Sequence, residues 1–165
     1  MIRTAEMKDL PELRRIYACA RKLMRETGNP HQWSNNGPGE DLVVNDINNA
    51  NSYVMEDEDG IYAVFSFITG EDETYGFIEG QWLNDEPYGT IHRIASDGTH
   101  RGIMRDAVEY CCQRVSNLRI DTHEDNKIMQ HQVLKLGFTY CGIIYLLNGE
   151  PRRAYQKVIE KTACL

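Results

Sequence analysis

Apolar residues recur at helical spacing near the start of the chain. Over residues 8–26 they repeat every three to four positions, which places them on one face of a helix. The stripe consists of Leu10, Leu13, Ile16, Tyr17, Ala20, Leu23 and Met24. Asp9 suits the N-cap, Pro11 suits the first turn, and Gly28 and Pro30 end the pattern. A long first helix is therefore predicted.

Shorter apolar runs bounded by turn residues predict the strands. They cover residues 1–5, 51–57, 60–70, 90–96 and 117–123, and a hairpin over 138–160 that turns at "NGEP". Helical spacing recurs over residues 40–50, 101–115 and 124–136. Residues 29–40 are rich in Asn, Gly and Pro and predict a loop, whereas residues 71–89 give no clear pattern.

The predicted order of elements is β-αα-βββ-α-β-α-ββ. The strands at 90–96 and 117–123 should be parallel, because a crossover helix joins them. The earlier strands and the last hairpin should be antiparallel. The pattern thus predicts an α/β (α+β) fold with a mixed, mostly antiparallel sheet.

Length and charge narrow the class of protein. A chain of 165 residues predicts a single domain, 1–165. The net charge of −7 argues against a general binder of nucleic acid or of anionic membranes, and an acidic surface suits a cationic substrate. No apolar run approaches the roughly 20 residues that span a bilayer, and the first residues, "MIRTAEMKDLPELRR", contain no apolar signal core. We expect a cytoplasmic protein.

The cysteines and the acidic cluster "DTHED" do not predict a metal site. The five cysteines, an odd number without a CxxC pair, favour reduced thiols: Cys19, Cys111, Cys112, Cys141 and Cys164. One thiol of the Cys111–Cys112 pair should face the core. Residues 121–125 lack distant ligand partners, so they are interpreted as the end of a strand and a helix start capped by Asp125.

The stretch "IHRIASDGTHRGIMRDAVEYC" raises a chemical question. A strand meets two glycines four residues apart, Gly98 and Gly102, and a helix begins directly afterwards. The junction is either a plain tight turn or a turn whose free N–H groups hold a phosphate at a helix N-terminus. His100 and Arg101 would add donors to the second kind of turn.

A second stretch, "DNKIMQHQVLKLGF", and the order of elements resemble the GCN5-related N-acetyltransferase (GNAT) superfamily. Its members bind acyl-CoA with a turn of the form Q/R-x-x-G-x-G/A, and residues 99–104 lie at the corresponding positions, where Gly102 matches the central glycine. Its later signature is an Asn, a small residue three on, a Tyr seven on and a closing Gly-Phe. Asn126 and the Gly-Phe pair match, while Met129 and Val133 stand in place of the small residue and the Tyr.

The resemblance implies the acyl-CoA N-acyltransferase (GNAT) fold, with splayed parallel central strands near 90–96 and 118–123. The pantetheine arm of acetyl-CoA is expected between those two strands. The expected cofactor-binding residues are Ile94, Ala95 and Ser96 by their main chain, Thr99, His100, Arg101, Gly102, Ile103 and Met104 at the pyrophosphate, and Asn126 and Met129 at the CoA arm.

The implied reaction is direct transfer of an acetyl group from acetyl-CoA to a primary amine. His92 is the candidate general base, with a hydrogen-bonded strand histidine as the alternative interpretation and Glu79 or Glu86 as other bases. Because Val133 cannot donate a proton, Tyr140, Tyr145 or water is expected to protonate the leaving thiolate.

The acceptor pocket in this family lies at the loop after the first helix and in the segment before the fourth strand. Trp33, Trp82 and Glu86 are the candidate substrate residues, although each Trp can equally fill the core. The expected partners are acyl-CoA and an amine, with neither nucleic acid nor membrane, and a homodimer is possible by resemblance. The alternative function is a non-catalytic acyl-CoA-binding or regulatory module of the same fold.

Overall fold

The computed structural model describes residues 1–33 and 36–160. The chain forms two compact units, Met1–Phe67 with Ile91–Ile103, and Ile68–Thr90 with Met104–Leu165. Two strands, β3 (Gly60–Thr69) and β5 (Gly89–Ser96), contribute residues to both units. The order of hydrogen-bonded strands is β1-β2-β3-β5-β6-β8-β7-β4. The expectation of a single domain over residues 1–165 stays a prediction.

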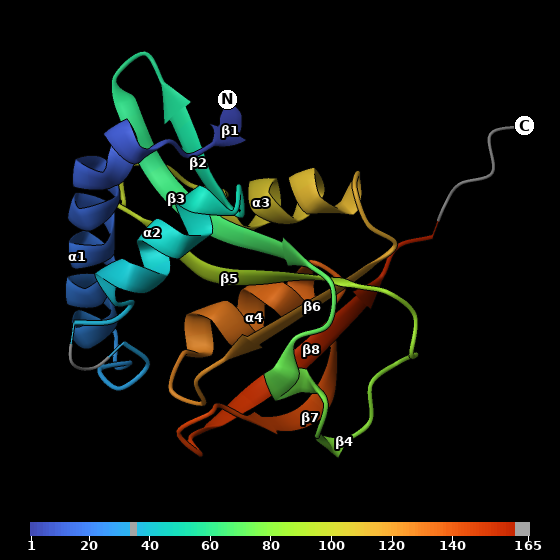
Figure 1. Ribbon diagram of the computed structural model, residues 1–165. Coiled ribbons are helices and arrows are strands. Elements are labelled where there is room, and N and C mark those ends of the chain that lie inside the picture. Colours follow the sequence, from blue (N-terminus) through green and yellow to red (C-terminus); the bar gives the residue numbers. More distant parts are fainter. Residues whose placement is uncertain (34–35, 161–165) are drawn as a thin grey trace, which may run out of the picture. The chain divides into compact units, whose positions relative to one another are not determined.

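The first unit contains three strands besides the end of β5. They are β1 (Ile2–Thr4), β2 (Ser52–Asp57) and β3 (Gly60–Thr69), and the pairs β1–β2 and β2–β3 are antiparallel as predicted. Two helices, α1 (Leu10–Glu26) and α2 (Glu40–Asn48), lie beside these strands (Figure 1). Their buried residues pack against Val54, Val64 and Ala95 of the sheet.

Two details of the first helix differ from the prediction. Leu23 is 48% exposed, so the buried stripe of α1 ends at Ala20. Asp9 occupies the N-cap position without capping α1; it closes the 3₁₀ turn η1 (Met7–Asp9) by accepting the N–H of Glu6 at 2.8 Å. Its carboxylate also accepts two hydrogen bonds from Arg3, at 2.8 and 3.1 Å, and these lower the pKa of Asp9.

The second unit is built on an antiparallel sheet. Its strands are β6 (Asn117–Thr122), β8 (Pro151–Val158), β7 (Thr139–Tyr145) and β4 (Glu79–Gly80). The first two residues of β5 pair in parallel with β6, Gly89 with Leu118 and Thr90 with Arg119, which confirms the predicted parallel pair. The helices are α3 (Ile103–Cys112) and α4 (Lys127–Lys135), and a 3₁₀ turn, η2 (Glu73–Tyr75), precedes β4.

The short strand β4 has no signal in the sequence because a close backbone contact creates it. Gly80 of β4 pairs with Gly142 of β7, and both have positive φ, 134° and 144°. A Cβ on Gly80 would overlap the carbonyl oxygen of Cys141, and one on Gly142 would overlap that of Glu79. Only glycine permits this approach, which tertiary contact and not local pattern reveals.

The two helices of the second unit also begin later than predicted. Helix α3 starts at Ile103, immediately after Gly102, whose φ of 76° is not helical. The N-cap of α4 is Asn126 and not Asp125, since the Asn126 side chain accepts the N–H of Met129 at 3.1 Å. An Asn side chain is as good a cap as Asp, so the two neighbours were not separable by residue type.

The cysteines occupy ordinary packing positions. Cys111 is completely buried, as predicted for one member of the pair, and burial raises the pKa of its thiol to about 12. The described cysteines are all free, and Cys164 lies outside the described residues. Within the described ranges, no helix is long and apolar enough to cross a membrane and no group of three or more His, Cys, Asp or Glu could hold a metal ion.

Candidate functional site

Strand β5 is irregular at Arg93, one residue after the candidate base His92. The φ of Arg93 is 50°, a left-handed conformation that is uncommon for a residue other than glycine. Its Nε and Nη2 donate to the buried carboxylate of Asp46 in α2, at 2.8 and 2.9 Å. Its carbonyl oxygen accepts the hydroxyl of Tyr17 in α1 at 3.2 Å. Both helices of the first unit therefore hold the strand in this shape.

The three residues expected to bind the pantetheine arm by their main chain come directly after Arg93 on β5. Ala95 is 6% exposed and belongs to the apolar core of the first unit. Ile94 and Ser96 are half-buried, as is His92. The strand thus presents alternate residues outside the core, in the stretch whose main chain was expected to bind the pantetheine arm.

The glycine turn is folded around the carboxylate of Asp97. Asp97 accepts the N–H of Thr99 at 3.1 Å, the hydroxyl of Thr99 at 2.6 Å and a bond from Arg15 of α1 at 3.1 Å. Burial alone would raise the pKa of Asp97, but these hydrogen bonds hold it below its ordinary value. The Thr99 N–H, expected at the pyrophosphate, is therefore occupied in this structure.

The ring of His100 is held in place by contacts on its face and at both nitrogens. Its ring stacks on Tyr62 with 3.7 Å between centroids, Nε2 lies 2.8 Å from Asp57 Oδ2, and Nδ1 lies 2.7 Å from the Thr99 hydroxyl. The remaining part of the turn is open. Gly98 has a φ of 83° with no atom within 4 Å of a Cβ placed on it, and among the described residues no hydrogen bond uses the N–H groups of Arg101 and Gly102.

The turn therefore fits a phosphate at Arg101 and Gly102 better than at Thr99. Free N–H groups at the start of α3 and the positive end of its dipole both attract an anion. Met104, which stands where the family has Gly or Ala, is 7% exposed and points into the protein with Ala107, Val108 and Cys111. Its bulk is thus buried. The first turn of α3 also carries Asp106, a carboxylate that opposes an anion.

The residues expected at the CoA arm are mostly used by helix α4 itself. The Asn126 side chain caps the helix, and Met129 is 8% exposed. Val133, at the position where the family has a tyrosine, is completely buried. The valine is therefore part of the buried core.

Replacing Val133 with tyrosine is expected to destabilise the protein by about 1–3 kcal/mol, because a ring must enter a filled core. Urea unfolding followed by circular dichroism measures the change, with Val133→Ile as the control that adds only one methylene. A tyrosine variant as stable as the wild type would show that this helix face has free space.

The two candidate acids on β7 differ in their surroundings. The Tyr145 hydroxyl hydrogen-bonds Glu79, which raises the pKa of Tyr145 and makes it a weaker proton donor. Tyr140 is 45% exposed, and its ring lies edge-on to Tyr155 with 5.5 Å between centroids. The hydroxyl of Tyr145 is therefore already engaged, and the role of either residue as the acid stays a prediction.

Trp82 packs around a buried arginine that the sequence did not single out. The guanidinium carbon of Arg119, on β6, lies 4.0 Å from the centroid of Trp82 and 3.9 Å from that of Tyr88. Arg119 is 5% exposed, and burial lowers its pKa. The indole N–H of Trp82 donates to the carbonyl oxygen of Tyr75 at 3.0 Å. Trp82 thus makes packing contacts in this structure, and its role as a substrate residue stays a prediction.

A buried amide network fixes the segment that follows Trp82. Gln156 donates to the side-chain oxygens of Asn84 and Asn117, both at 3.1 Å, and accepts the N–H of Leu83 at 3.0 Å. Glu86 is exposed, and its N–H donates to Asn84 at 3.2 Å. The segment is therefore held by polar contacts between strands far apart in the chain, for which the local sequence gave no signal.

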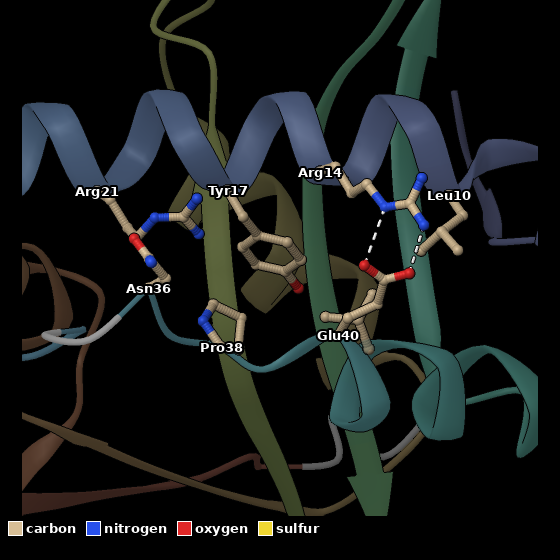
Figure 2. A pocket seen from close by; sticks show the side chains of 8 residues that line it. Leu10, Arg14, Tyr17, Arg21, Asn36, Pro38 and Glu40 are labelled. Carbon is tan, nitrogen blue, oxygen red and sulfur yellow. Dashed lines mark hydrogen bonds and ion pairs between the residues drawn. The ribbon is translucent and has the colours of Figure 1, made fainter.

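Trp33 lies at a cavity of the first unit. Its ring is half-buried and lies edge-on to Tyr17, 5.6 Å between centroids. Two cavities of about 260 and 140 Å³ adjoin α1 here and share Arg21 and Asn36 in their walls. Arg14, Tyr17 and Arg21 project from one side of α1 toward the 36–40 segment (Figure 2).

The cavity arginines were missed at the sequence level. Arg14, Arg21 and Arg25 are spaced by seven and four residues, which puts them on neighbouring turns of one helix face. That spacing could have predicted a basic face on the helix, but the prediction rested only on the apolar stripe.

Comparison with known proteins places the chain in a family. No family model matches the sequence, and no curated protein matches it. A solved GNAT-family acetyltransferase from Streptococcus agalactiae is 34% identical, with a TM-score of 0.84, over 98% of this chain and 96% of that one. The chain therefore belongs to the GNAT family of acetyltransferases, and the predicted fold is confirmed.

More distant structures share the fold alone. A GNAT-family acetyltransferase from Listeria monocytogenes is 19% identical with a TM-score of 0.70, over 96% of this chain and 94% of that one. A ribosomal-protein-alanine N-acetyltransferase from Brucella melitensis is also 19% identical, with a TM-score of 0.64, over 96% and 99%.

Proposed function

We propose that this protein transfers an acetyl group from acetyl-CoA directly to a primary amine. The observation that carries the proposal is the 34% identity to a GNAT acetyltransferase over nearly the whole chain. The open glycine turn at the start of α3 and the irregular strand β5 support it. Whatever the acceptor is, acetyl-CoA is expected to raise the melting temperature of the protein, because it binds the folded state. A thermal melt with and without acetyl-CoA measures the shift.

Different residues are proposed to bind different parts of acetyl-CoA. The main chain of Ile94, Ala95 and Ser96 binds the extended arm, and the N–H groups of Arg101 and Gly102 bind phosphate. Acetyl-CoA supplies the activated acetyl thioester. The roles of Asn126 and Met129 at the CoA arm, and of Ile103, Met104, Thr99 and His100 at the phosphates, stay predictions.

Two proton transfers accompany the reaction. An alkylamine with an ordinary pKa of about 10.4 is mostly charged at neutral pH and must lose a proton before it attacks. We assign that proton to His92 on β5 and keep Glu79 and Glu86 as alternatives. The sulfur of the leaving group gains a proton from Tyr140, Tyr145 or water. Because Tyr145 already donates to Glu79, Tyr140 is the first of these to test.

Gly102→Asp is expected to weaken acetyl-CoA binding by about tenfold or more, because a carboxylate then faces the phosphates. Isothermal titration calorimetry with acetyl-CoA measures the affinity. Gly102→Asn is the matched control, since it has nearly the same shape and the same strain at φ 76° but no charge. If both variants bind as tightly as the wild type, the phosphates do not lie at this turn.

The second candidate function is an acyl-CoA-binding module without catalysis. The buried Val133 and the Thr99 N–H occupied by Asp97 favour it, because the usual proton donor is missing and the usual phosphate site is partly filled. Such a module would gain thermal stability from acetyl-CoA but release no CoA with any amine. A cytoplasmic location and a homodimer also stay proposals.

A further inference from the structure

The two cavities beside α1 carry more positive than negative charge. Arg14 is neutralised by a two-pronged ion pair with Glu40 (Figure 2). Arg21 donates one hydrogen bond, to the carbonyl oxygen of Gly37 at 3.1 Å, and has no ion pair within the described ranges. Arg25, in the wall of the larger cavity, forms no ion pair with any described residue. Two guanidinium groups thus border this cavity, and no described residue of its wall carries a carboxylate.

This local charge is opposite to that of the whole protein. With 25 acidic and 18 basic residues, the chain repels anions on average. A cationic wall in such a chain favours an anion only where the arginines stand. The carboxylate in these walls, Glu40, is already paired with Arg14, so it does not cancel Arg21 and Arg25.

The larger cavity also has an apolar wall and a buried hydrogen-bond acceptor. Trp33, Met24 and Pro30 line it and suit a ring or an alkyl chain. Asn29 is 2% exposed; its Nδ2 donates to Gln32 at 2.9 Å, and its Oδ1 accepts no hydrogen bond within the described ranges. A buried acceptor without a donor is unfavourable, so a ligand N–H that reaches Asn29 Oδ1 is favoured.

Tyr17 links the wall of the smaller cavity to strand β5. Tyr17 lines it, and the hydroxyl of Tyr17 donates to the carbonyl oxygen of Arg93. Arg93 follows the candidate base His92. Arg21 and Tyr17 therefore share the wall of one cavity, and Tyr17 contacts the residue that follows His92.

We propose that the acceptor is a small amine that also carries an anionic group, a carboxylate or a phosphoryl group, and that Arg21 and Arg25 bind this group. The proposal rests on the proposed function and names the substrate class of the same site. It replaces the expectation, drawn from the net charge, of a purely cationic substrate. Arginine suits either anion because its fork of N–H donors matches two oxygen atoms at once.

Matched pairs of amines test the proposal. Phenylalanine is compared with phenethylamine, and O-phosphoethanolamine with ethanolamine, so that each pair differs in the anionic group. Calorimetry without acetyl-CoA gives the affinities, and thiol release with acetyl-CoA gives kcat/KM. The member of one pair that carries the anionic group is expected to bind about tenfold or more tightly than the member without it, and the preferred pair identifies carboxylate or phosphoryl.

Variants on α1 assign the effect to the two arginines. Arg25→Gln and Arg21→Gln are each expected to reduce the affinity for the amine with the anionic group by about tenfold and to leave the affinity for the amine without it unchanged. Lys22→Gln is the control, because Lys22 lies between them and its side chain is 73% exposed. Arg25 is exposed, so Arg25→Gln should fold normally. It therefore still tests the proposal if Arg21→Gln does not fold.

The two proposals fail separately. Equal or weaker binding of both anionic amines, including none detected, or a preference that survives both arginine variants, overturns the anion site. If acetylation proceeds without any preference for the anionic members, the proposed function stands and this inference fails. If the anionic amines bind through Arg21 and Arg25 but no acetyl group is transferred, the site stands and the proposed function fails.

Discussion

Replacing Asp46 with alanine is expected to lower the free energy of unfolding by about 3–5 kcal/mol. Asp46 is 3% exposed and accepts three hydrogen bonds, two from Arg93 and one from the Ser66 hydroxyl at 2.7 Å. The alanine leaves the Arg93 guanidinium, with its side chain 15% exposed, without its counter-charge. An unpaired charge at such a site costs far more than the net value of the pair.

A double-mutant cycle separates the lost pair from the lost packing. Urea unfolding is measured for Asp46→Ala, Arg93→Met and the double variant, and the double variant should be much less destabilised than the sum of the two. Ser66→Ala, which removes one hydroxyl from the same carboxylate, should cost only about 1 kcal/mol. A loss below about 1 kcal/mol for Asp46→Ala would mean that the ion pair does not hold β5.

Replacing His92 with glutamine is expected to lower kcat by about 10²-fold or more, because glutamine cannot take the proton of the amine. The loss should shrink as the pH rises toward the amine pKa of about 10.4, where a larger share of the acceptor is already neutral. Steady-state kinetics from pH 6 to 10 measure the profile.

The alternative for His92 predicts a different profile. If the side chain is only a hydrogen-bonding strand residue, the glutamine variant loses little activity or loses it equally at every pH. A thermal melt of the variant checks that it folds, and Glu79→Gln and Glu86→Gln show whether either carboxylate is the base instead.

Much of the fold was readable from local spacing, since long amphipathic patterns fix their own secondary structure. Helix α1 ends at Glu26 and strand β3 begins at Gly60, as the pattern predicted. The parallel pairing of Gly89 and Thr90 followed from the crossover helix. The strand that was missed, β4, depends on a contact between residues far apart in the sequence, the close backbone pairing of Gly80 and Gly142.

The candidate site was predicted less completely, for the same reason. The glycine turn and His92 were identified by type and position, but the capture of the Thr99 N–H by Asp97 depends on the exact fold of the turn. The stacking of Arg119 between Trp82 and Tyr88 joins segments that are distant in sequence. Residue type therefore located the chemistry, while only the fold showed which donors remain available.

The most direct test is to incubate the purified protein with acetyl-CoA and the four matched amines, and to measure CoA thiol release together with the mass of each amine. The account predicts thiol release in step with a product heavier by one acetyl group. In one of the two pairs the amine with the anionic group should be the better acceptor, and Gly102→Asp should be the poorer enzyme. Thermal stabilisation by acetyl-CoA with no acetylated amine, or no response to acetyl-CoA at all, would contradict the assignment of an amine acetyltransferase.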